Sequence, residues 1–449
     1  YKAIIDNFNQ ASLHDPSEET IQKYLHIEEI KEEDPFGNLM IRPLFSHSSI
    51  NDLLQMEIVN IEDIDDTSNY IYPVMLHHNA ELAVTHIELI DQRIIDKIKN
   101  KTCKLILDNT LEGDTIERFL PTLFNSIKNL KLPYEQIYFI TNNLKAEEYF
   151  KEWLNSSKIF IDSFKLQDKE VLKDITKDNF YHNSINVISF PWNIHDVKRL
   201  THLKHLPESI NIEKEIEYKQ NNLVNIKPFL KVNRTGRPER SLMMLYLNYY
   251  NLLSKFKISF PRLDHLNDFE ALIHQKFPEI ISQENINSLK TKIPFDIDKS
   301  DTDNHGQPGT GKGRFNADLP FDPLHYRDTF LSVVMCAFPH TENACHLHSS
   351  TFNPIYCGHP YIGFGPLNHL ANLKKLGFRT FNKWWDEGYD NFPHHLDRLE
   401  HILRVIEKLS KYSNSDFLEM YKEMKHTLQY NSNLIKKFNG REELTRKIF

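Results

Sequence analysis

Short apolar runs that alternate with helical segments most constrain the fold of this 449-residue chain. Runs such as Tyr70–Leu76, Cys103–Leu107 and Gln136–Ile140 are separated by segments such as Thr115–Ile127, where apolar residues recur every three or four positions. Buried strands alternating with helices are typical of βαβ units in a parallel sheet. The rhythm restarts at Ile226. The sequence therefore predicts an α/β fold with two Rossmann-like domains that face a cleft.

The same rhythm sets the expected domain boundaries. We expect a first domain over residues 1–225, irregular and helical up to about residue 65, and a second domain over residues 226–428. A hinge is expected near residues 215–227. Helical patterns continue to the end, so residues 429–449 are expected to form a helical tail that can cross back to the first domain. Ligands of such sheets bind at the carboxyl ends of the strands, which is where we expect the site.

Composition excludes several classes of protein. The formal net charge is -8, from 54 basic and 62 acidic residues, which argues against a protein that coats DNA. A local basic groove is compatible with this net charge. No run of 18 apolar residues occurs, so we expect no membrane span. The 4 cysteines show no framework spacing, which favours a reducing compartment, and we expect a cytoplasmic protein. The oligomeric state cannot be predicted.

Glycine is scarce, with 13 residues in the chain, and nine of them lie between Gly306 and Gly388. The run from Gly306 to Gly313 (GQPGTGKG) fits the first seven positions of a P-loop. Neither a strand before it nor a helix after it is predicted, and Gly313 lacks the hydroxyl that would hold Mg²⁺. A P-loop NTPase is therefore the weakest alternative. We favour a basic loop whose Lys312 closes over a ligand.

A group of cysteines and histidines has spacings that could suit the ligands of a metal site. Cys336 and Cys357 lie in apolar runs, however, and are better explained as core thiols. The sequence has 23 histidines, so clustering by chance is common. We expect no metal and no cofactor. The group consists of Cys336, His340, Cys345, His346, His348, Cys357 and His359.

An arginine-rich turn follows a predicted strand and enters a helix. In NRTGRPER, the residues Asn233, Arg234, Arg237 and Arg240 offer cations and a polar amide where backbone N–H groups are free. Such a turn suits an anion, for example a diphosphate. The alternative is a solvated helix start with salt bridges. Arginine in the first turn opposes the helix macrodipole, which favours function.

Two further segments carry candidate site residues. Ser349, Ser350 and Thr351 begin a predicted helix, where one hydroxyl can cap the helix and the others can bind phosphate, and His359 follows in the next helix–strand unit. In the first domain, Asp108 and Glu112 lie after a predicted strand, where a general base is expected. The alternative to a catalytic role is that Asp114 caps the helix that follows this segment. His77–His78 are weaker candidates of the same kind.

These segments together resemble a family of glycosyltransferases of large DNA viruses and phages with the GT-B architecture. The similarity covers most of residues 65–435. It is strongest in NRTGRPER (233–240) and in Thr351–Asp390 (TFNPIYCGHPYIGFGPLNHLANLKKLGFRTF…WWDEGYD), and it includes LDNTLEGD (107–114) and FITNN (139–143). The resemblance implies that the second domain binds a nucleotide-sugar donor, that the first serves the acceptor side, and that no metal is obligatory.

The chain departs from this family at three places. The family has Glu where this chain has Cys336, Glu-Lys where it has Ser349–Ser350, and often Lys where it has Asn353. The loop residues Lys312 and Arg314 are expected to supply the missing charge, or transfer activity is weak or absent.

The resulting hypothesis is a metal-independent glycosyltransferase that moves a sugar from a nucleotide sugar to a hydroxyl of a glycan or of a modified nucleic-acid base. Asp108 or Glu112 is the expected catalytic base. The alternative is a non-catalytic nucleotide- or sugar-binding protein on the same fold. The expected donor-binding residues are Asn233, Arg234, Arg237, Arg240, Lys312, Ser349, Ser350, Thr351 and His359.

Overall fold

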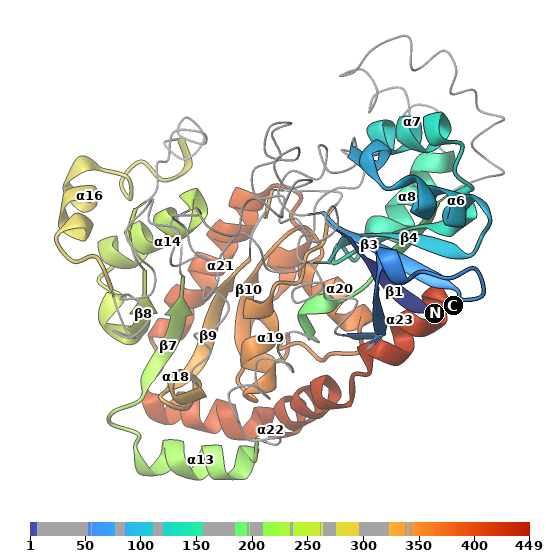
Figure 1. Ribbon diagram of the computed structural model, residues 1–449. Coiled ribbons are helices and arrows are strands. Elements are labelled where there is room, and N and C mark those ends of the chain that lie inside the picture. The colour runs from blue at the N-terminus through green and yellow to red at the C-terminus, as the bar shows by residue number, and fades with distance from the viewer. Residues whose placement is uncertain are drawn as a thin grey trace, which may run out of the picture. The chain divides into compact units, whose positions relative to one another are not determined.

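The computed structural model describes residues 1–6, 53–54, 56–76, 86–110, 120–155, 185–194, 197, 210–233, 237–260, 262–263, 275–295, 323–336, 339–340 and 344–449. Its contacts separate two compact units (Figure 1). Unit 1 comprises residues 1–192, 343–346 and 439–449, and unit 2 comprises residues 193–342 and 347–438. The contacts thus divide the chain after Trp192, whereas the sequence predicts a domain boundary at residue 225.

Unit 1 contains a six-stranded sheet in the order β2-β1-β3-β4-β5-β6, and all of its strand pairings are parallel. The predicted strands Tyr70–Leu76, Cys103–Leu107 and Gln136–Ile140 are confirmed by β3, β4 and β5. The expectation of irregular and helical structure up to residue 65 was wrong for β1 and β2, which form there and pair with each other, and residues 7–52 lie outside the described residues. The strands are β1 (Lys2–Ile5), β2 (Glu57–Asn60), β3 (Tyr70–Met75), β4 (Cys103–Asn109), β5 (Ile137–Thr141) and β6 (Asn186–Ser189).

The helices of unit 1 follow local sequence signals. Asp91 begins α6 by accepting a hydrogen bond from Arg93 N–H, and Ile94, Ile95 and Ile98 of that helix are buried. An Asp at this position satisfies a free N–H and favours the helix. The helices are α6 (Gln92–Lys99), α7 (Leu120–Leu130), α8 (Ala146–Asn155) and α23 (Gly440–Ile448), with 3-10 turns η2 (Ile61–Asp63), η3 (His86–Leu89) and η5 (Tyr134–Gln136).

The core of unit 1 lies on both faces of the central strands. Leu105, Ile106 and Leu107 are consecutive in β4 and all fully buried, as is Phe139 of β5. Burial on both faces explains why these strands read as continuous apolar runs rather than as an alternating pattern. Each such side chain contributes about 1.5–3 kcal/mol of transfer free energy.

Unit 2 contains a four-stranded parallel sheet in the order β10-β9-β7-β8. Phe229 of β7 and Phe330 of β9 both contact the ring of Phe417, with ring centroids 5.6 Å and 5.7 Å apart. These contacts pack the sheet against α22. The strands are β7 (Lys227–Val232), β8 (Phe256–Ser259), β9 (Thr329–Met335) and β10 (Tyr361–Phe364).

Two helices of unit 2 bear on the sequence expectations. α13 covers part of the segment where a hinge is expected and runs beside α22 (Figure 1), and the hinge itself stays a prediction. The helical pattern near the end of the chain includes one long helix, α22, which begins with a capping box of Ser413 and Asp416. The helices are α13 (Ile212–Asn221), α14 (Pro238–Tyr249), α16 (Gln283–Lys290), α18 (Pro323–Arg327), α19 (Ser349–Tyr356), α20 (His369–Lys375), α21 (His395–Ser410) and α22 (Asn414–Lys437), with turns η6 (Leu253–Lys255) and η8 (Gly388–Asn391).

The predicted α/β class, with two parallel sheets, flanking helices and a helical C-terminal region, is confirmed. The arrangement of the two units around a cleft stays a prediction. Within the described ranges, no helix has both the length and the apolar character that a membrane span requires.

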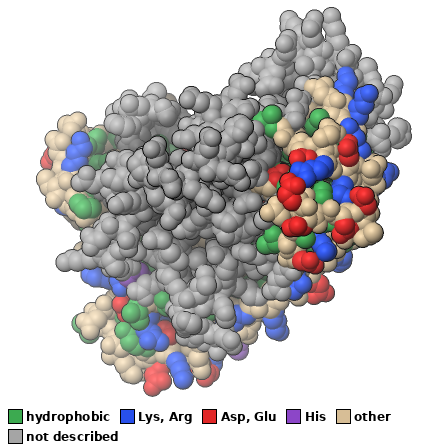
Figure 2. Space-filling model, viewed as in Figure 1, with side chains coloured by type: hydrophobic (Ala, Val, Ile, Leu, Met, Phe, Trp, Pro, Cys, Tyr) green, Lys and Arg blue, Asp and Glu red, His purple; other side chains and the backbone are tan. Residues whose placement is uncertain are grey.

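The described surface carries both signs of charge. Figure 2 shows Lys and Arg side chains intermixed with Asp and Glu over the described part of one face. Ion pairs of unit 1 include Arg93 with Glu62 and Lys101 with Glu135. Exposed pairs of this kind contribute about 0–1 kcal/mol each. The described part of this face therefore has mixed charge.

Candidate functional site

The candidate site of unit 2 lies at one edge of its sheet. Because β7, β9 and β10 run parallel, their carboxyl ends share this edge, where α14, α19 and α20 follow them in the chain. Open α/β sheets bind ligands at this edge. The structure brings most of the described donor-binding candidates here.

The turn from β7 to α14 places an amide and two guanidiniums at this edge. Asn233 is buried, its backbone N–H donates to Ser259 O at 2.9 Å, and its Nδ2 has no partner among the described residues. Arg237 is the N-cap residue of α14 but makes no side-chain cap bond. Arg240 Nη2 donates to Met335 O at 3.0 Å, which brings its guanidinium to the end of β9. Arg234 lies outside the described residues.

Lys231 of β7 is a candidate site residue that the sequence did not indicate. It is fully buried, and its Nζ lies 3.0 Å from Met335 Sδ. Burial, with a smaller contribution from the Arg240 charge, holds the pKa of this amine well below its usual range. A charged residue inside the apolar run FLKV was the available signal, because lysine is almost never fully buried without a partner.

The first turn of α19 follows the end of β9. The sequence predicts that a hydroxyl residue caps this helix, but the cap is His348, whose Nδ1 accepts from Ser350 N–H at 3.3 Å. Ser349 Oγ also lies 3.2 Å from that nitrogen. Ser350 Oγ is buried without a partner in the described chain. Thr351 Oγ1 lies 3.4 Å from the Cys336 sulfur.

Cys336 and His369 form a buried thiol–imidazole pair that the sequence did not reveal. The Cys336 sulfur lies 4.0 Å from His369 Nδ1. Burial opposes both charged forms, but the two groups favour each other's charge, so the pKa of Cys336 is lowered and that of His369 is raised. Gly365 makes room for the ring, because a Cβ there would lie 2.4 Å from His369 Nδ1.

The amino end of α20 is already bonded within unit 2. The Asp390 carboxylate accepts from Leu370 N–H at 2.9 Å and from Ala371 N–H at 3.0 Å. Glu387 Oε1 accepts from Phe381 N–H at 2.7 Å. The acidic residues of the WWDEGYD segment therefore hold the loop that follows α20.

The structure does not bring His359 together with the other donor candidates. His359 precedes β10, at the opposite edge of the sheet, and is buried. Its Nδ1 lies 2.9 Å from Ser332 Oγ, and its Nε2 lies 2.9 Å from Thr329 O. Burial holds its pKa well below the usual range. Both ring nitrogens thus have partners inside unit 2.

In unit 1, Asp108 lies in β4 close to its carboxyl end and is buried. Its Oδ1 accepts from Thr110 N–H at 3.0 Å and from Thr110 Oγ1 at 2.7 Å, so the carboxylate orders the turn after the strand. Glu112 lies outside the described residues. At the end of β5, Asn142 Nδ2 lies 3.1 Å from His346 Nε2. His346 is thus a second titratable group of unit 1 close to the carboxyl end of a strand.

The cysteines and histidines considered for a metal separate in the structure. Cys336 pairs with His369, Cys345 and His346 belong to unit 1, and His359 bonds to Ser332. Among the described residues, no group of three potential ligands gathers. The glycine-rich loop with Lys312 lies outside the described residues.

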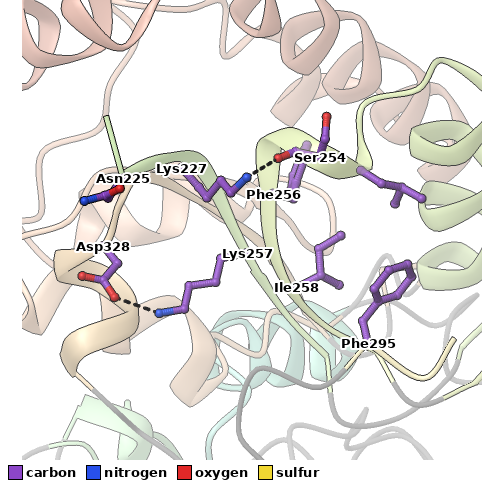
Figure 3. A pocket seen from close by; sticks show the side chains of 9 residues that line it. Asn225, Lys227, Ser254, Phe256, Lys257, Ile258, Phe295 and Asp328 are labelled. Atoms are coloured by element: carbon purple, nitrogen blue, oxygen red, sulfur yellow. Dashed lines mark hydrogen bonds and ion pairs between the residues drawn. The ribbon is translucent and has the colours of Figure 1, made fainter. Parts of the chain in front are cut away.

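A pocket of about 490 Å³ lies elsewhere in unit 2 (Figure 3). It lies near the amino ends of the strands, where Lys257 Nζ pairs with Asp328 at 3.0 Å and Lys227 Nζ donates to Ser254 O at 2.8 Å. Its cations therefore have partners. The pocket is opposite to the edge that carries the candidate site.

Comparison with known proteins does not identify the function, so the function is inferred from the residues of the site. No family model and no curated protein matches the chain. The chain is similar to solved structures that include trehalose-6-phosphate from E. coli bound with UDP-2-fluoro glucose (TM-score 0.39, 12% identity, covering 85% of this chain and 74% of that chain). They also include the N-terminal domain of Candida albicans trehalose-6-phosphate phosphatase (TM-score 0.30, 10% identity, 90% of this chain and 93% of that chain). The resemblance to the viral and phage family stays a prediction.

Proposed function

We propose that the protein is a glycosyltransferase that uses a nucleotide-sugar donor. The observation that carries this proposal is the edge of unit 2 where the β7–α14 turn, with Asn233, Arg237 and Arg240, and the first turn of α19 both follow the carboxyl ends of parallel strands. Guanidiniums and buried N–H and O–H groups suit a diphosphate, which is anionic and accepts hydrogen bonds. The carboxyl edge of a parallel sheet is where such ligands bind.

The proposed reaction depends on stabilisation of the leaving group. As the bond from the sugar to the diphosphate breaks, negative charge grows on the phosphate oxygens, and Arg237 and Arg240 stabilise it. Preorganised electrostatic stabilisation is usually the largest part of such a rate enhancement. Asp108 or Glu112 of unit 1 takes the proton of the acceptor hydroxyl, on a glycan or a modified nucleic-acid base. We propose that the reaction is metal-independent.

The proposal is tested by calorimetric titration with UDP-, GDP-, CMP- and dTDP-sugars. Arg237→Ala is expected to weaken binding of the preferred donor by at least ~10-fold, because a charge-assisted hydrogen bond contributes about 1.5–3 kcal/mol. Arg404→Ala is the matched control, since Arg404 is exposed on α21, outside the β7–α14 turn, and pairs with Glu400. Equal donor affinity of Arg237→Ala and the wild type would rule out the assignment.

A non-catalytic binding protein is the second candidate, and Cys336 favours it. At the end of β9 this chain has the Cys336 thiol, which lies beside the His369 imidazole. The family that the sequence resembles has a carboxylate at this position. Incubation with the same donors distinguishes the two functions. Transfer to an acceptor, or slow hydrolysis of the donor, supports the enzyme. Tight donor binding with neither reaction supports the binding protein.

A further inference from the structure

Lys231 is difficult to explain by packing alone. Its side chain is fully buried in the sheet of unit 2, and the contact of its amine is the thioether of Met335, at 3.0 Å. A thioether is a weak hydrogen-bond acceptor. Within the described part of the chain, no carboxylate forms an ion pair with this amine. Burying an ammonium without a partner is costly, so the group is held neutral.

The elements around β7 do not supply the missing negative charge. Arg240 of α14 is the charged group that acts on the amine, and it disfavours the ammonium further. The side chains of other neighbouring elements are bonded elsewhere: Lys257 of β8 to Asp328, Lys255 of η6 to Ser410 O, Tyr421 of α22 to Gly358 O, and Cys336 after β9 to Thr351 and His369.

The groups near the amine are donors rather than acceptors. Asn233 continues the ladder of β7 through its bond to Ser259, so it lies two residues from Lys231 on the same face of the strand. Its Nδ2 is buried without a partner in the described chain. Arg240 reaches the same place through Met335 O. The Nδ2 of Asn233 and the amine of Lys231 are thus two buried N–H groups that an anionic ligand would satisfy.

We propose that binding of an anionic donor transfers one proton from solvent to Lys231, so that the site binds a nucleotide diphosphate more tightly as the pH falls. This inference rests on the proposed function, since it concerns the same site. The phosphate groups of the ligand supply the negative charge that no described side chain places beside the Lys231 amine. The ammonium is then favoured in the complex, whereas burial disfavours it in the free protein.

The expected size of the effect follows from linkage. Uptake of one proton makes the affinity fall by up to about tenfold for each unit that the pH rises, over the range where the free amine is neutral and the bound amine is charged. Sugar esters of nucleoside diphosphates suit this measurement, because their diphosphate does not titrate near neutral pH. We therefore choose UDP-glucose, GDP-mannose and dTDP-glucose as probes.

The test is isothermal titration of the full chain with each probe at pH 8 in Hepes and in Tris, which differ in ionisation enthalpy. The difference in observed heat gives the number of protons exchanged. An uptake approaching one proton, with affinity that falls from pH 7 to pH 9, supports the inference. Binding without proton exchange overturns it and leaves the proposed function standing. Failure of all nucleotide sugars to bind contradicts the proposed function itself.

Two variants assign the proton to a residue. Lys231→Met keeps the length of the side chain and removes the amine, so proton uptake and the pH dependence of affinity should both disappear. Lys227→Met is the control, because Lys227 is exposed at the start of the same strand and bonds to Ser254. Proton uptake that persists in Lys231→Met would overturn the assignment.

A second readout needs no ligand. The unfolded chain holds a proton on Lys231 up to about pH 10.5, whereas burial makes the folded chain lose that proton at a much lower pH, so folding releases a proton between these two pH values. The wild type should therefore gain stability as the pH rises from 7 towards 10, and Lys231→Met should be less pH-dependent over that range and at least as stable at pH 7. Identical pH dependence of the two proteins would count against the inference.

Discussion

The thiol of Cys336 is surrounded by groups that favour its charged form. His369 Nδ1 and Thr351 Oγ1 lie 4.0 Å and 3.4 Å from the sulfur, and the first turn of α19 follows. Helix amino ends and neighbouring imidazoles lower the pKa of a thiol. The pKa of Cys103 shows the opposite effect, because burial without such donors raises it. One chain therefore holds buried thiols of contrasting acidity.

We predict a measurable thiolate at Cys336 below the usual titration of cysteine at about pH 8.5. The pKa of Cys336 is lowered, so the ultraviolet absorbance of its thiolate should appear at a lower pH than that of an ordinary thiol. Cys336→Ser should remove this signal, and His369→Phe should move it to higher pH. Cys103→Ser is the control and should leave it unchanged. A low-pH thiolate signal that survives Cys336→Ser would contradict the prediction.

Single residues show where sequence reasoning stops. The turn at 233–240 could be predicted because its arginines follow a strand, and the structure brings Arg240 to the end of β9. The pairing of Cys336 with His369 spans 33 residues and depends on how β9 and β10 align. The sequence pattern places Lys231 in a strand, and only tertiary packing shows that its amine contacts the thioether of Met335.

Among the elements, the buried strands in the middle of the sheet of unit 1, such as β4, were predictable, and β1 and β2 were not. Cys103–Asn109 contains the apolar run Leu105–Leu107 and was recognised from it. Glu57–Asn60 is largely exposed, and Lys2–Ile5 lies far from it in sequence. These two strands exist because they pair with each other, from Lys2 with Glu57 to Ile5 with Asn60. Pairing partners that are about 55 residues apart leave no local signal.

A buried lysine joins α13 to the start of β9. Lys219 Nζ donates to the carbonyl oxygens of Tyr326, Arg327 and Thr329 at 3.0 Å, 2.7 Å and 2.6 Å. It also lies 5.0 Å from the ring centroid of Tyr421 in α22. One side chain thus satisfies the carbonyls where α18 ends and β9 begins, and it holds the helical layer to the sheet.

We predict that Lys219→Met destabilises the protein by about 2–5 kcal/mol, because three carbonyls lose a buried donor. Urea unfolding followed by circular dichroism measures the change. Lys214→Met is the matched control, since Lys214 is exposed on the same helix, and it should change stability by less than about 0.5 kcal/mol. A loss no larger than that of the control would show that the three bonds are dispensable.

At the scale of the whole molecule, neither unit is made from one stretch of chain. Asn143 of unit 1 holds the segment 343–346 through Cys345, whose N–H donates to Asn143 Oδ1 at 2.8 Å. The last helix, α23, also belongs to unit 1: Lys447 Nζ donates to Ser189 O at 3.2 Å. The ring centroids of Tyr1 and Phe449 lie 4.4 Å apart. Such contacts between distant segments cannot be inferred from local pattern.

Deletion of residues 439–449 should therefore weaken unit 1 selectively. We expect amide hydrogen exchange to become faster in β1 and β4, which neighbour α23 through Tyr1 and Lys104, while β7 and β9 of unit 2 keep their protection. Local stability differs between cooperative parts of a chain, and exchange reports it part by part. Equal acceleration in both units, or in neither, would contradict this expectation.

The placement of α23 also bears on the order in which the protein is made. The ribosome completes the strands β1 to β6 of unit 1 by Ser189, yet the helix that bonds to Ser189 O is synthesised much later. At 5–20 residues per second, roughly 13–50 s separate these two events. During that interval the nascent unit 1 lacks the contacts of residues 447–449 with Ser189, Lys104 and Tyr1. Parts of unit 1 that are synthesised early are therefore fully protected only after α23 has been made.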